Sequence, residues 1–261
     1  MTERSTPAAP ATSGFGVDLS KTPSRIAQMF DDIAGRYDTL NHLLSAGLDR
    51  HWRRRAVEAL KLTGRERVLD VCTGTADLAM ALARAAQGVV GVDFSSEMLR
   101  RGANKVRNSA LKSRVALARG DAMRLPFSDA VFDAATVAFG IRNVVDPVGA
   151  AAEIRRVLRP GGKLAVLEFG LPETPGLRGL YLWYFRVVLP RVGRLVSRHR
   201  DAYTYLPASV EEFPSGMAFG QLLRASGFST VDCRPLAQGA VWLYLAASDE
   251  MRSSLGGTPA Q

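Results

Sequence analysis

Two aspartates stand directly after predicted strands, at positions where their carboxylates could bind a nucleoside. Asp93 ends the apolar run of residues 89–93, and Asp121 follows the run of residues 115–119 within Gly120-Asp121-Ala122. In an open parallel sheet, ligands bind beyond the carboxyl ends of the strands. Asp93 could there accept hydrogen bonds from both ribose hydroxyls, and Asp121 from an adenine amino group. Both could instead be solvated loop acids, but their places at successive strand ends favour a nucleoside site.

The turn that precedes these acids distinguishes between a dinucleotide and a nucleoside without a pyrophosphate. Residues 67–72 form a β-branched apolar run, and Thr73-Gly74-Thr75 then leads into an Ala/Leu-rich helical pattern, as in nucleotide-binding α/β folds. Gly74 is the only glycine of this turn, whereas a dinucleotide site needs Gly-x-Gly-x-x-Gly for its pyrophosphate. A nucleoside without a pyrophosphate, such as S-adenosylmethionine, fits better. Asp70 could fix the turn amides or contact the ligand's amino group, and Thr75 could bind the ligand or cap the next helix.

Alternating strand and helix patterns must position these residues, and they predict a mostly parallel sheet with helices on both faces. We expect strands at residues 67–72, 89–93, 115–119, 132–138, 163–169, 228–234 and 240–247. Helices are predicted at residues 77–86, 96–108, 147–158 (ended by Pro160-Gly161-Gly162) and 216–226. Upstream, the pattern is helical from Ser24 to about Leu62, with a break near Gly35 and a second helix from about Asp49.

Composition bounds the class of protein. The 261 residues can hold one large α/β domain or two small ones, and 47% hydrophobic content suffices for a sizeable core. A formal charge of +9 predicts an anionic partner, either nucleic acid or a lipid surface. Cys72 and Cys233 lie in apolar strand-like runs, which indicates buried free thiols. No Cys/His cluster has metal-ligand spacing, so we expect no metal.

The chain ends and its most apolar window predict no export or membrane segment. Residues 1–22 lack an apolar core of signal-peptide length, so we expect disordered tails there and at residues 251–261. Residues 180–189 are interrupted by Arg186 and fall short of the roughly 20 residues of a membrane span. A cytoplasmic location follows from these expectations.

Three other segments resemble one family. Residues 37–45, Tyr-Asp-Thr-Leu-Asn-His-Leu-Leu-Ser, with the later Trp52, are similar to the N-terminal signature of the ubiquinone/menaquinone C-methyltransferase family. Residues 156–162, Arg-Val-Leu-Arg-Pro-Gly-Gly, with the later Glu168, resemble its second signature. Phe139-Gly140-Ile141-Arg142-Asn143 is also typical of this family, and the resemblance covers nearly the whole chain between the tails.

This family belongs to the class I S-adenosylmethionine-dependent methyltransferases. The resemblance therefore implies a Rossmann-like α/β fold with a mostly parallel seven-stranded sheet and an antiparallel last strand. It implies one domain over residues 23–250, with a helical cap at residues 23–65 and a lid or substrate insertion at residues 176–209. The chain departs from the family at Asp49, where histidine is usual, so a proton-transfer role at that position does not carry over.

The implied reaction is methyl transfer from S-adenosylmethionine to a ring carbon of a polyprenylated quinol, with demethylmenaquinol as the first choice of acceptor. Arg142 would stabilise the phenolate electrostatically, because a guanidinium is too weakly acidic to serve as a base. Asn143 would orient Arg142 or a water, with Tyr37 and Asp38 as further catalytic partners. The expected cofactor-binding residues are Asp70, Gly74, Thr75, Asp93, Phe94, Asp121, Ala122 and Ala138.

Each catalytic role has a plainer alternative. Arg142 could form a salt bridge with a surface acid, and Tyr37 could pack against the cofactor without taking part in the chemistry. His42 and His51 fit exposed helix positions, although His42 could also serve as the general base because its pKa range suits that task.

The segment of residues 176–209 joins bulky apolar side chains to the basic residues Arg191, Arg194, Arg198, His199 and Arg200. With a polyprenyl acceptor, it could form a lid and a patch for anionic headgroups at the inner face of the plasma membrane. The alternative is an ordinary core helix with a solvated basic end. The resemblance leaves open a homodimer or contacts with other quinone-biosynthesis proteins.

Three functions other than quinol methylation are alternatives for this chain. A nucleic-acid methyltransferase would bring an Asn-Pro-Pro-Tyr-like turn after the fourth strand or a catalytic loop cysteine. Here the turn reads Phe-Gly-Ile-Arg-Asn and both cysteines fall in predicted strands, so we expect no nucleic-acid partner. A methyltransferase for a soluble metabolite and a non-catalytic scaffold of quinone biosynthesis are the other two alternatives.

Overall fold

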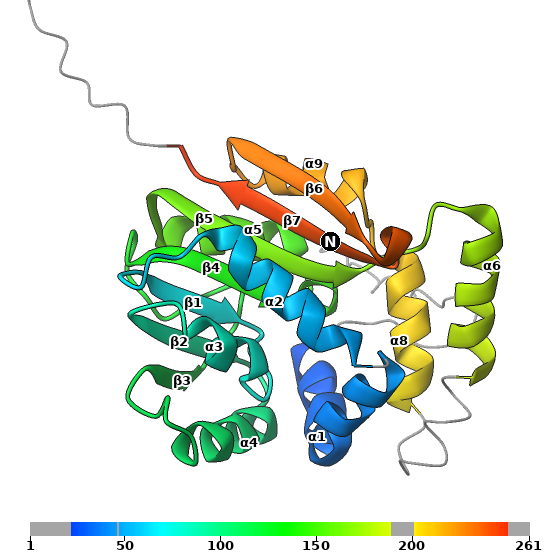
Figure 1. Ribbon diagram of the computed structural model, residues 1–261, viewed down its shortest axis with the longest axis horizontal. Coiled ribbons are helices and arrows are strands. Elements are labelled where there is room, and N and C mark those ends of the chain that lie inside the picture. The colour runs from blue at the N-terminus through cyan, green and yellow to red at the C-terminus, as the bar shows by residue number, and fades with distance from the viewer. Residues whose placement is uncertain (1–21, 46, 189–200, 250–261) are drawn as a thin grey trace, which may run out of the picture.

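A seven-stranded sheet forms the centre of the computed structural model, which describes residues 22–45, 47–188 and 201–249 (Figure 1). The strand order is β3-β2-β1-β4-β5-β7-β6, and all neighbouring pairs are parallel except the two made by β7. The strands are β1 (Arg67–Val71), β2 (Gly88–Asp93), β3 (Val115–Arg119), β4 (Phe132–Ala138), β5 (Leu158–Phe169), β6 (Thr230–Leu236) and β7 (Val241–Ala247). The predicted fold class, a mostly parallel sheet closed by an antiparallel strand, is confirmed.

Alternate strand residues face two separate cores, one on each side of the sheet. Val68 packs with helices α2 and α3 on one side, whereas its neighbour Leu69 shares a core with α5 and α9 on the other. Figure 1 shows α2 and α3 crossing in front of the strands. The helices of these two layers are α2 (Leu48–Leu60), α3 (Asp77–Leu82), α4 (Ser96–Arg107), α5 (Pro147–Val157) and α9 (Met217–Ala225).

The N-terminal cap contains one long helix where the sequence predicts two pieces. Helix α1 (Pro23–Leu44) runs through Gly35, so the predicted break there is wrong. One glycine costs a helix only about 1 kcal/mol, and here it allows a close approach to α4. A Cβ at Gly35 would lie 3.1 Å from Nη2 of Arg101. The chain turns instead at Gly47, whose φ of 77° is left-handed, and α2 begins at Leu48.

A second difference concerns Pro160-Gly161-Gly162, which the sequence predicts as the stop signal of a helix. Helix α5 already ends at Val157, and β5 begins at Leu158. Phe132 of β4 pairs with Leu158, and the next pair joins Ala134 to Lys163. The Pro-Gly-Gly turn is therefore an irregularity within β5. The other predicted elements agree with the structure to within a few residues, apart from the helix expected at 77–86, which ends at Leu82.

The predicted lid segment is divided between two helices that follow β5 in the chain. It contains α6 (Pro175–Trp183), a π-helical turn (Tyr184–Val188) and the start of α8 (Asp201–Glu212). Helix α6 buries no side chain and stands beyond α8 in Figure 1. Arg191, Arg194, Arg198, His199 and Arg200 lie outside the described residues, as do most of the two predicted tails. Within the described ranges, no helix is long and apolar enough to cross a membrane.

Candidate active site

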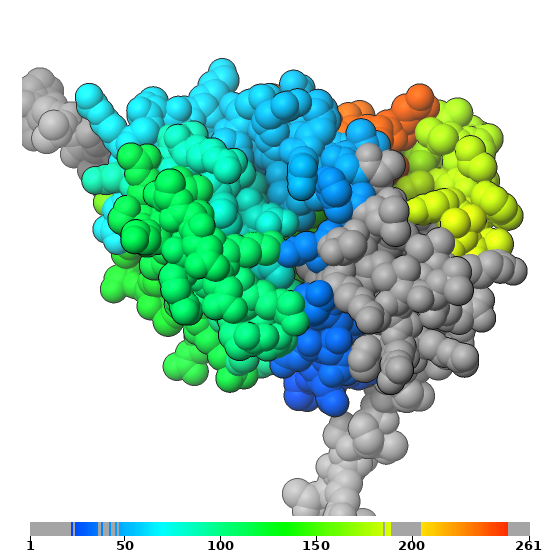
Figure 2. All heavy atoms as spheres, turned by 60° about the horizontal axis from the view of Figure 1, so that its bottom comes forward, coloured from blue at the N-terminus to red at the C-terminus, as the bar shows by residue number. Residues whose placement is uncertain are grey.

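A pocket opens beyond the carboxyl ends of β1 to β4. The empty space in it, part of which is open to solvent, is about 860 Å³. Helix α1 forms one wall with Ile26, Ala27 and Phe30. Figure 2 shows α1 (dark blue) exposed beside the green segment that contains α4. Six of the eight predicted cofactor residues line this pocket: Gly74, Asp93, Phe94, Asp121, Ala122 and Ala138.

The turn after β1 leaves room for a ligand at Gly74. Gly74 has a φ of 56°, and no atom lies within 4 Å of the place where its Cβ would be. Cys72 and Ala76 on either side also adopt positive φ, of 55° and 66°, which is uncommon for residues with a side chain and clusters at functional sites. The turn is thus held in an unusual shape with its backbone open toward the pocket.

Asp93 joins this turn to the next strand end. Its Oδ2 accepts from the Gly74 amide at 2.7 Å, and its Oδ1 accepts from the Ser95 amide at 2.9 Å. Burial raises the pKa of Asp93, and these amide hydrogen bonds act in the opposite direction. A carboxylate has about four lone-pair sites, so both oxygens keep capacity for ribose hydroxyls. Asp121 accepts from the Met123 amide at 2.9 Å through Oδ1 and likewise keeps capacity.

Asp70 lies behind the turn and is absent from the pocket lining. It is 1% exposed and accepts from the hydroxyls of Thr73 and Thr136, each at 2.6 Å. Burial raises its pKa to about 6, against the effect of these two hydrogen bonds. Of its two predicted roles, the contacts support fixing the turn, because they tie β1, the turn and β4 together.

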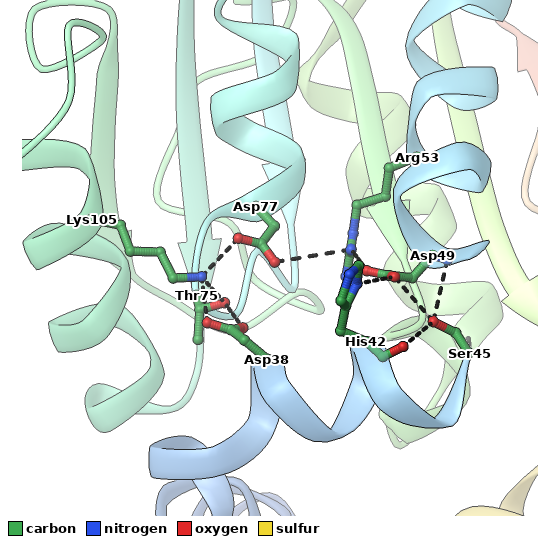
Figure 3. Close-up of polar contacts among 8 residues, drawn as sticks. All are labelled: Asp38, His42, Ser45, Asp49, Arg53, Thr75, Asp77 and Lys105. Carbon is green, nitrogen blue, oxygen red and sulfur yellow. Dashed lines mark hydrogen bonds and ion pairs between the residues drawn. The ribbon is translucent and has the colours of Figure 1, made fainter. Parts of the chain in front are cut away.

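Thr75 and Asp38, predicted for cofactor binding and catalysis, join the cap to the sheet (Figure 3). The hydroxyl of Thr75 donates to Oδ1 of Asp38 at 2.5 Å, and the ammonium of Lys105 lies 2.5 Å from Oδ2. Lys105 also contacts Asp77 at 2.7 Å. Thr75 does not cap α3, whose first turn has no side-chain cap. Neither Thr75 nor Asp38 is among the pocket-lining residues that the structure describes.

A second group in Figure 3 surrounds Asp49, which stands where the family usually has histidine. Asp49 accepts from Ser45 at 3.0 Å, lies 2.8 Å from Nδ1 of His42 and forms an ion pair with Arg53. Burial alone would raise its pKa, but Arg53, His42 and Ser45 lower it. Arg53 is also 3.9 Å from Asp77, which links this group to Lys105. We call the connected set of Asp38, His42, Asp49, Arg53, Thr75, Asp77 and Lys105 the cap network.

Arg142 lies in the short helix η1 (Ile141–Asn143) after β4 and forms a buried ion pair. Its Nη1 contacts Oε1 of Glu168 at 2.7 Å and donates to the carbonyl of Phe139 at the same distance. Nε donates to Oγ of Ser209 on α8 at 3.4 Å. Arg142 is 6% exposed and Glu168 is 0% exposed. The salt bridge named in the plainer alternative is therefore present, but its acid is fully buried and does not lie at the surface.

Glu168 has no predicted role, although it stands one residue before the end of β5, next to the end of β4. Its place at a strand end is the signal that could have identified it, by the same reasoning that identified Asp93. Glu168 accepts from the backbone amides of Arg142 and Phe169 as well as from the guanidinium. It therefore holds η1 and β5 together.

Asn143 is the predicted catalytic residue that does line the pocket. It is 8% exposed, and its Oδ1 is buried with no hydrogen-bond partner among the described residues. Buried polar atoms are nearly always paired, so this oxygen has the capacity to accept a hydrogen bond from a ligand. The backbone of Tyr37 belongs to α1, but its side chain lies outside the described residues.

Cys72 corrects the expectation that both cysteines lie in strands. It follows β1, within the turn, and lines the pocket. Burial raises the pKa of its thiol well above the usual value, and the nearby Asp93 and Asp70 carboxylates act in the same direction. A protonated thiol is a poor nucleophile. Among the described residues, no group of three or more His, Cys, Asp or Glu is arranged to hold a metal ion.

Comparison with known proteins identifies the family of the chain. The ubiE/COQ5 methyltransferase family model matches residues 19–248. The ubiquinone/menaquinone biosynthesis C-methyltransferase UbiE of Geobacter sp. (strain M21) is 46% identical over 230 residues, which is 87% of this chain and 97% of that protein. The demethylmenaquinone methyltransferase of Bacteroides fragilis is 40% identical over 228 residues, 87% of this chain and 93% of that protein.

Solved structures share the fold at lower identity. An S-adenosylmethionine-dependent methyltransferase from Thermotoga maritima, described as a possible histamine N-methyltransferase, is 21% identical with a TM-score of 0.59, covering 86% of this chain and 100% of that one. A further S-adenosylmethionine-dependent methyltransferase, from Aquifex aeolicus, is 19% identical with a TM-score of 0.56, covering 87% and 98%.

Proposed function

Because the chain belongs to the ubiE/COQ5 methyltransferase family, we propose that it methylates a ring carbon of a polyprenylated quinol, with demethylmenaquinol as the acceptor. It is an S-adenosylmethionine-dependent methyltransferase. The observation that carries the choice of acceptor is the position of Asn143. Asn143 directly follows Arg142 in the chain and lines the same pocket as Gly74 and Asp93, and its buried Oδ1 has no described hydrogen-bond partner.

The pocket residues fit the cofactor. Gly74 leaves its backbone open, and the carboxylates of Asp93 and Asp121 would accept hydrogen bonds from the ribose and the adenine amino group. Ile26, Phe30 and Met98 supply an apolar wall for the purine. When bound, S-adenosylmethionine supplies an electrophilic methyl group on a sulfonium. The chain's own part is to orient the acceptor, exclude water and stabilise the charge on the acceptor oxygen.

Carbon methylation needs the acceptor as a phenolate. Loss of one hydroxyl proton to water makes the ortho ring carbon nucleophilic, and this carbon forms the new C–C bond as the methyl–sulfur bond breaks. The ring then loses its C–H proton while the oxygen regains one, so the reaction releases one proton in all. Arg142, always charged, would stabilise the oxyanion from behind Asn143. Glu168 would keep Arg142 in place without being exposed itself.

The acceptor's prenyl chain is insoluble in water, so we propose transient contact with an anionic membrane. Helix α6 supports this, since Leu180 and Trp183 are 60% and 54% exposed on it. We expect vesicles of acidic phospholipid to bind the protein. A variant with Arg191, Arg194 and Arg198 neutralised should bind them less well, and unchanged binding would contradict this part of the proposal.

The enzymatic proposal can be tested with purified protein, S-adenosylmethionine and short-chain acceptors. Demethylmenaquinol should gain one methyl group on the ring carbon by mass spectrometry and NMR, and desmethyl benzoquinols serve as comparison. Asn143→Ala should lose most turnover while Asn104→Ala, an exposed change on α4, should not. An Asn143→Ala variant as active as the wild type would contradict the proposal, and so would a wild-type protein that methylates no quinol.

A further inference from the structure

Tyr205 on α8 carries a buried hydroxyl that the mechanism above does not use. The residue is 5% exposed, and its hydroxyl has no hydrogen-bond partner among the described residues. A buried polar group without a partner costs free energy, and its replacement by an apolar group of the same shape is neutral or stabilising. The hydroxyl of Tyr205 therefore does not stabilise the fold, and its presence needs another explanation, such as a hydrogen bond to a ligand.

The position of Tyr205 is set by three elements. It lies one helical turn before Ser209, so both residues occupy the same face of α8, and Ser209 accepts from Nε of Arg142. Its ring packs against Ile26 and Met29 of α1, and Ile26 also lines the pocket. Tyr205 thus lies between α1 and η1, beside Arg142.

The charges that act on Tyr205 determine its protonation state. Burial has the largest effect on the pKa of the hydroxyl, and the charges of Arg142, Glu212, Arg25 and Glu168 have smaller effects on it. Burial raises the pKa of Tyr205, whereas the neighbouring guanidinium of Arg142 opposes this. The hydroxyl is therefore protonated at neutral pH and can donate a hydrogen bond.

Asn143 provides a second unpartnered polar atom near the same arginine. Asn143 lines the pocket from η1 and its Oδ1 is buried, whereas Tyr205 comes from α8, far along the chain. Two residues distant in sequence thus leave hydrogen-bonding capacity, one directly after Arg142 in η1 and one on the helix that Arg142 contacts. An internal network would have used this capacity, so we take it to be reserved for a ligand, with Asn143 accepting from a ligand donor and Tyr205 donating to a ligand oxygen.

We propose that Tyr205 binds the acceptor, its hydroxyl donating a hydrogen bond to the quinol oxygen that ionises beside Arg142. This inference rests on the proposed function and adds a residue to it. A donor aimed at an oxygen that becomes charged contributes more to the transition state than to the neutral acceptor. Tyr205 therefore raises turnover more than it raises affinity.

Tyr244 is a matched control within the same chain. It is also buried, but its hydroxyl accepts from the Gly216 amide at 2.7 Å. Tyr244→Phe leaves that amide unpaired and should lower the melting temperature, with turnover per folded molecule unchanged. Tyr205→Phe removes an unpaired hydroxyl and should leave the melting temperature unchanged or higher.

The deciding experiment measures stability, cofactor binding and kinetics on wild type, Tyr205→Phe and Tyr244→Phe. For Tyr205→Phe we expect unchanged S-adenosylmethionine affinity by calorimetry, a roughly 10- to 100-fold lower kcat with a smaller change in KM for the quinol, and an alkaline shift of the rising limb of the pH–rate profile. The shift arises because the bound quinol ionises less readily without the donor.

Each outcome decides between the possibilities. Tyr205→Phe with wild-type kcat and an unshifted pH profile overturns the role of Tyr205 while the proposed function stands. A lower melting temperature with kcat unchanged per folded molecule assigns the hydroxyl a structural role. If the wild-type protein methylates no quinol, the proposed function fails and the inference fails with it.

Discussion

In the cofactor half of the pocket, the acids are held by amides and hydroxyls of adjoining strand ends. The proposed acceptor half, which consists of Asn143 with Arg142, Glu168, Ser209 and Tyr205 next to it, instead depends on groups brought together from η1, β5 and α8. Asp93 takes its hydrogen bonds from Gly74 and Ser95, in the turns after β1 and β2. Arg142 finds Glu168 26 residues away and Ser209 67 residues away. The geometry of the cofactor half follows from the order of the strands alone. The geometry of the acceptor half also requires η1 and α8 to pack against each other.

The two halves also differ in how their polar groups are satisfied. The carboxylates of the cofactor half each have hydrogen-bond donors within the chain. The acceptor half contains a fully buried ion pair and two polar atoms, on Asn143 and Tyr205, without a described partner. On the proposed function, the cofactor half is built in advance, whereas the acceptor half keeps hydrogen-bonding capacity for its substrate.

The largest expected effect concerns the buried ion pair. Glu168→Ala should lower the free energy of unfolding by about 3–5 kcal/mol, because it leaves the guanidinium of Arg142 buried without its carboxylate. Urea unfolding measures this. As a control, Asp129→Ala removes an exposed partner of Arg156 and should cost less than about 1 kcal/mol. Equal losses in the two variants would show that the acceptor half does not depend on this pair.

Asp93 should dominate cofactor affinity. Asp93→Ala removes the acceptor of the proposed ribose hydroxyls and frees the Gly74 amide, so we expect the Kd for S-adenosylmethionine to rise on the order of 100-fold or more. Isothermal titration calorimetry measures it. Asp232→Ala, an exposed acid on β6 paired with Arg234, is the control and should leave the Kd unchanged. A change of less than threefold at Asp93 would remove it from the site.

Asp70 should make stability depend on pH. Because its folded pKa is raised to about 6 from 3.8, the folded state retains a proton that the unfolded state releases between these values. Its contribution to stability is therefore lost as pH rises from about 4 to 6 and is constant above that. Relative to Asp70→Asn, the wild type should lose on the order of 3 kcal/mol across this window. Parallel unfolding curves at pH 4, 5, 6 and 7 would contradict this expectation.

The smallest effect concerns the cap network. Asp38→Asn weakens a partly exposed ion pair with Lys105, so the loss of stability should stay below about 1 kcal/mol. Because α1 walls the pocket, the same variant should release S-adenosylmethionine several-fold faster in stopped-flow experiments. Lys105→Gln should have a similar effect, and the double variant should add little. Additive effects would show that the two side chains act independently.

Local patterns predicted most of the fold and the cofactor half of the site. The apolar strand runs, the Gly74 turn and the acids at strand ends lie within short stretches, where side-chain period and backbone preference act directly. The errors arose where packing decided. Helix α1 continues through Gly35, where the glycine allows α4 to approach closely, and β5 begins before Pro160 because Leu158 pairs with β4. Cys72 lies in a turn because left-handed backbone ends its strand early.

The sequence by itself determined the strands and, at their carboxyl ends, the position of a nucleoside site. It also determined that Arg142 and Asn143 follow the fourth strand, beside that site. Only the tertiary structure decided that Arg142 is paired with buried Glu168, that Asp38 and Thr75 join the cap to the sheet, and that Tyr205 lies next to Arg142. The physical reason is that strand ends meet at one edge whenever a parallel sheet forms. Contacts between distant helices depend on the packing of whole surfaces, which no local pattern encodes.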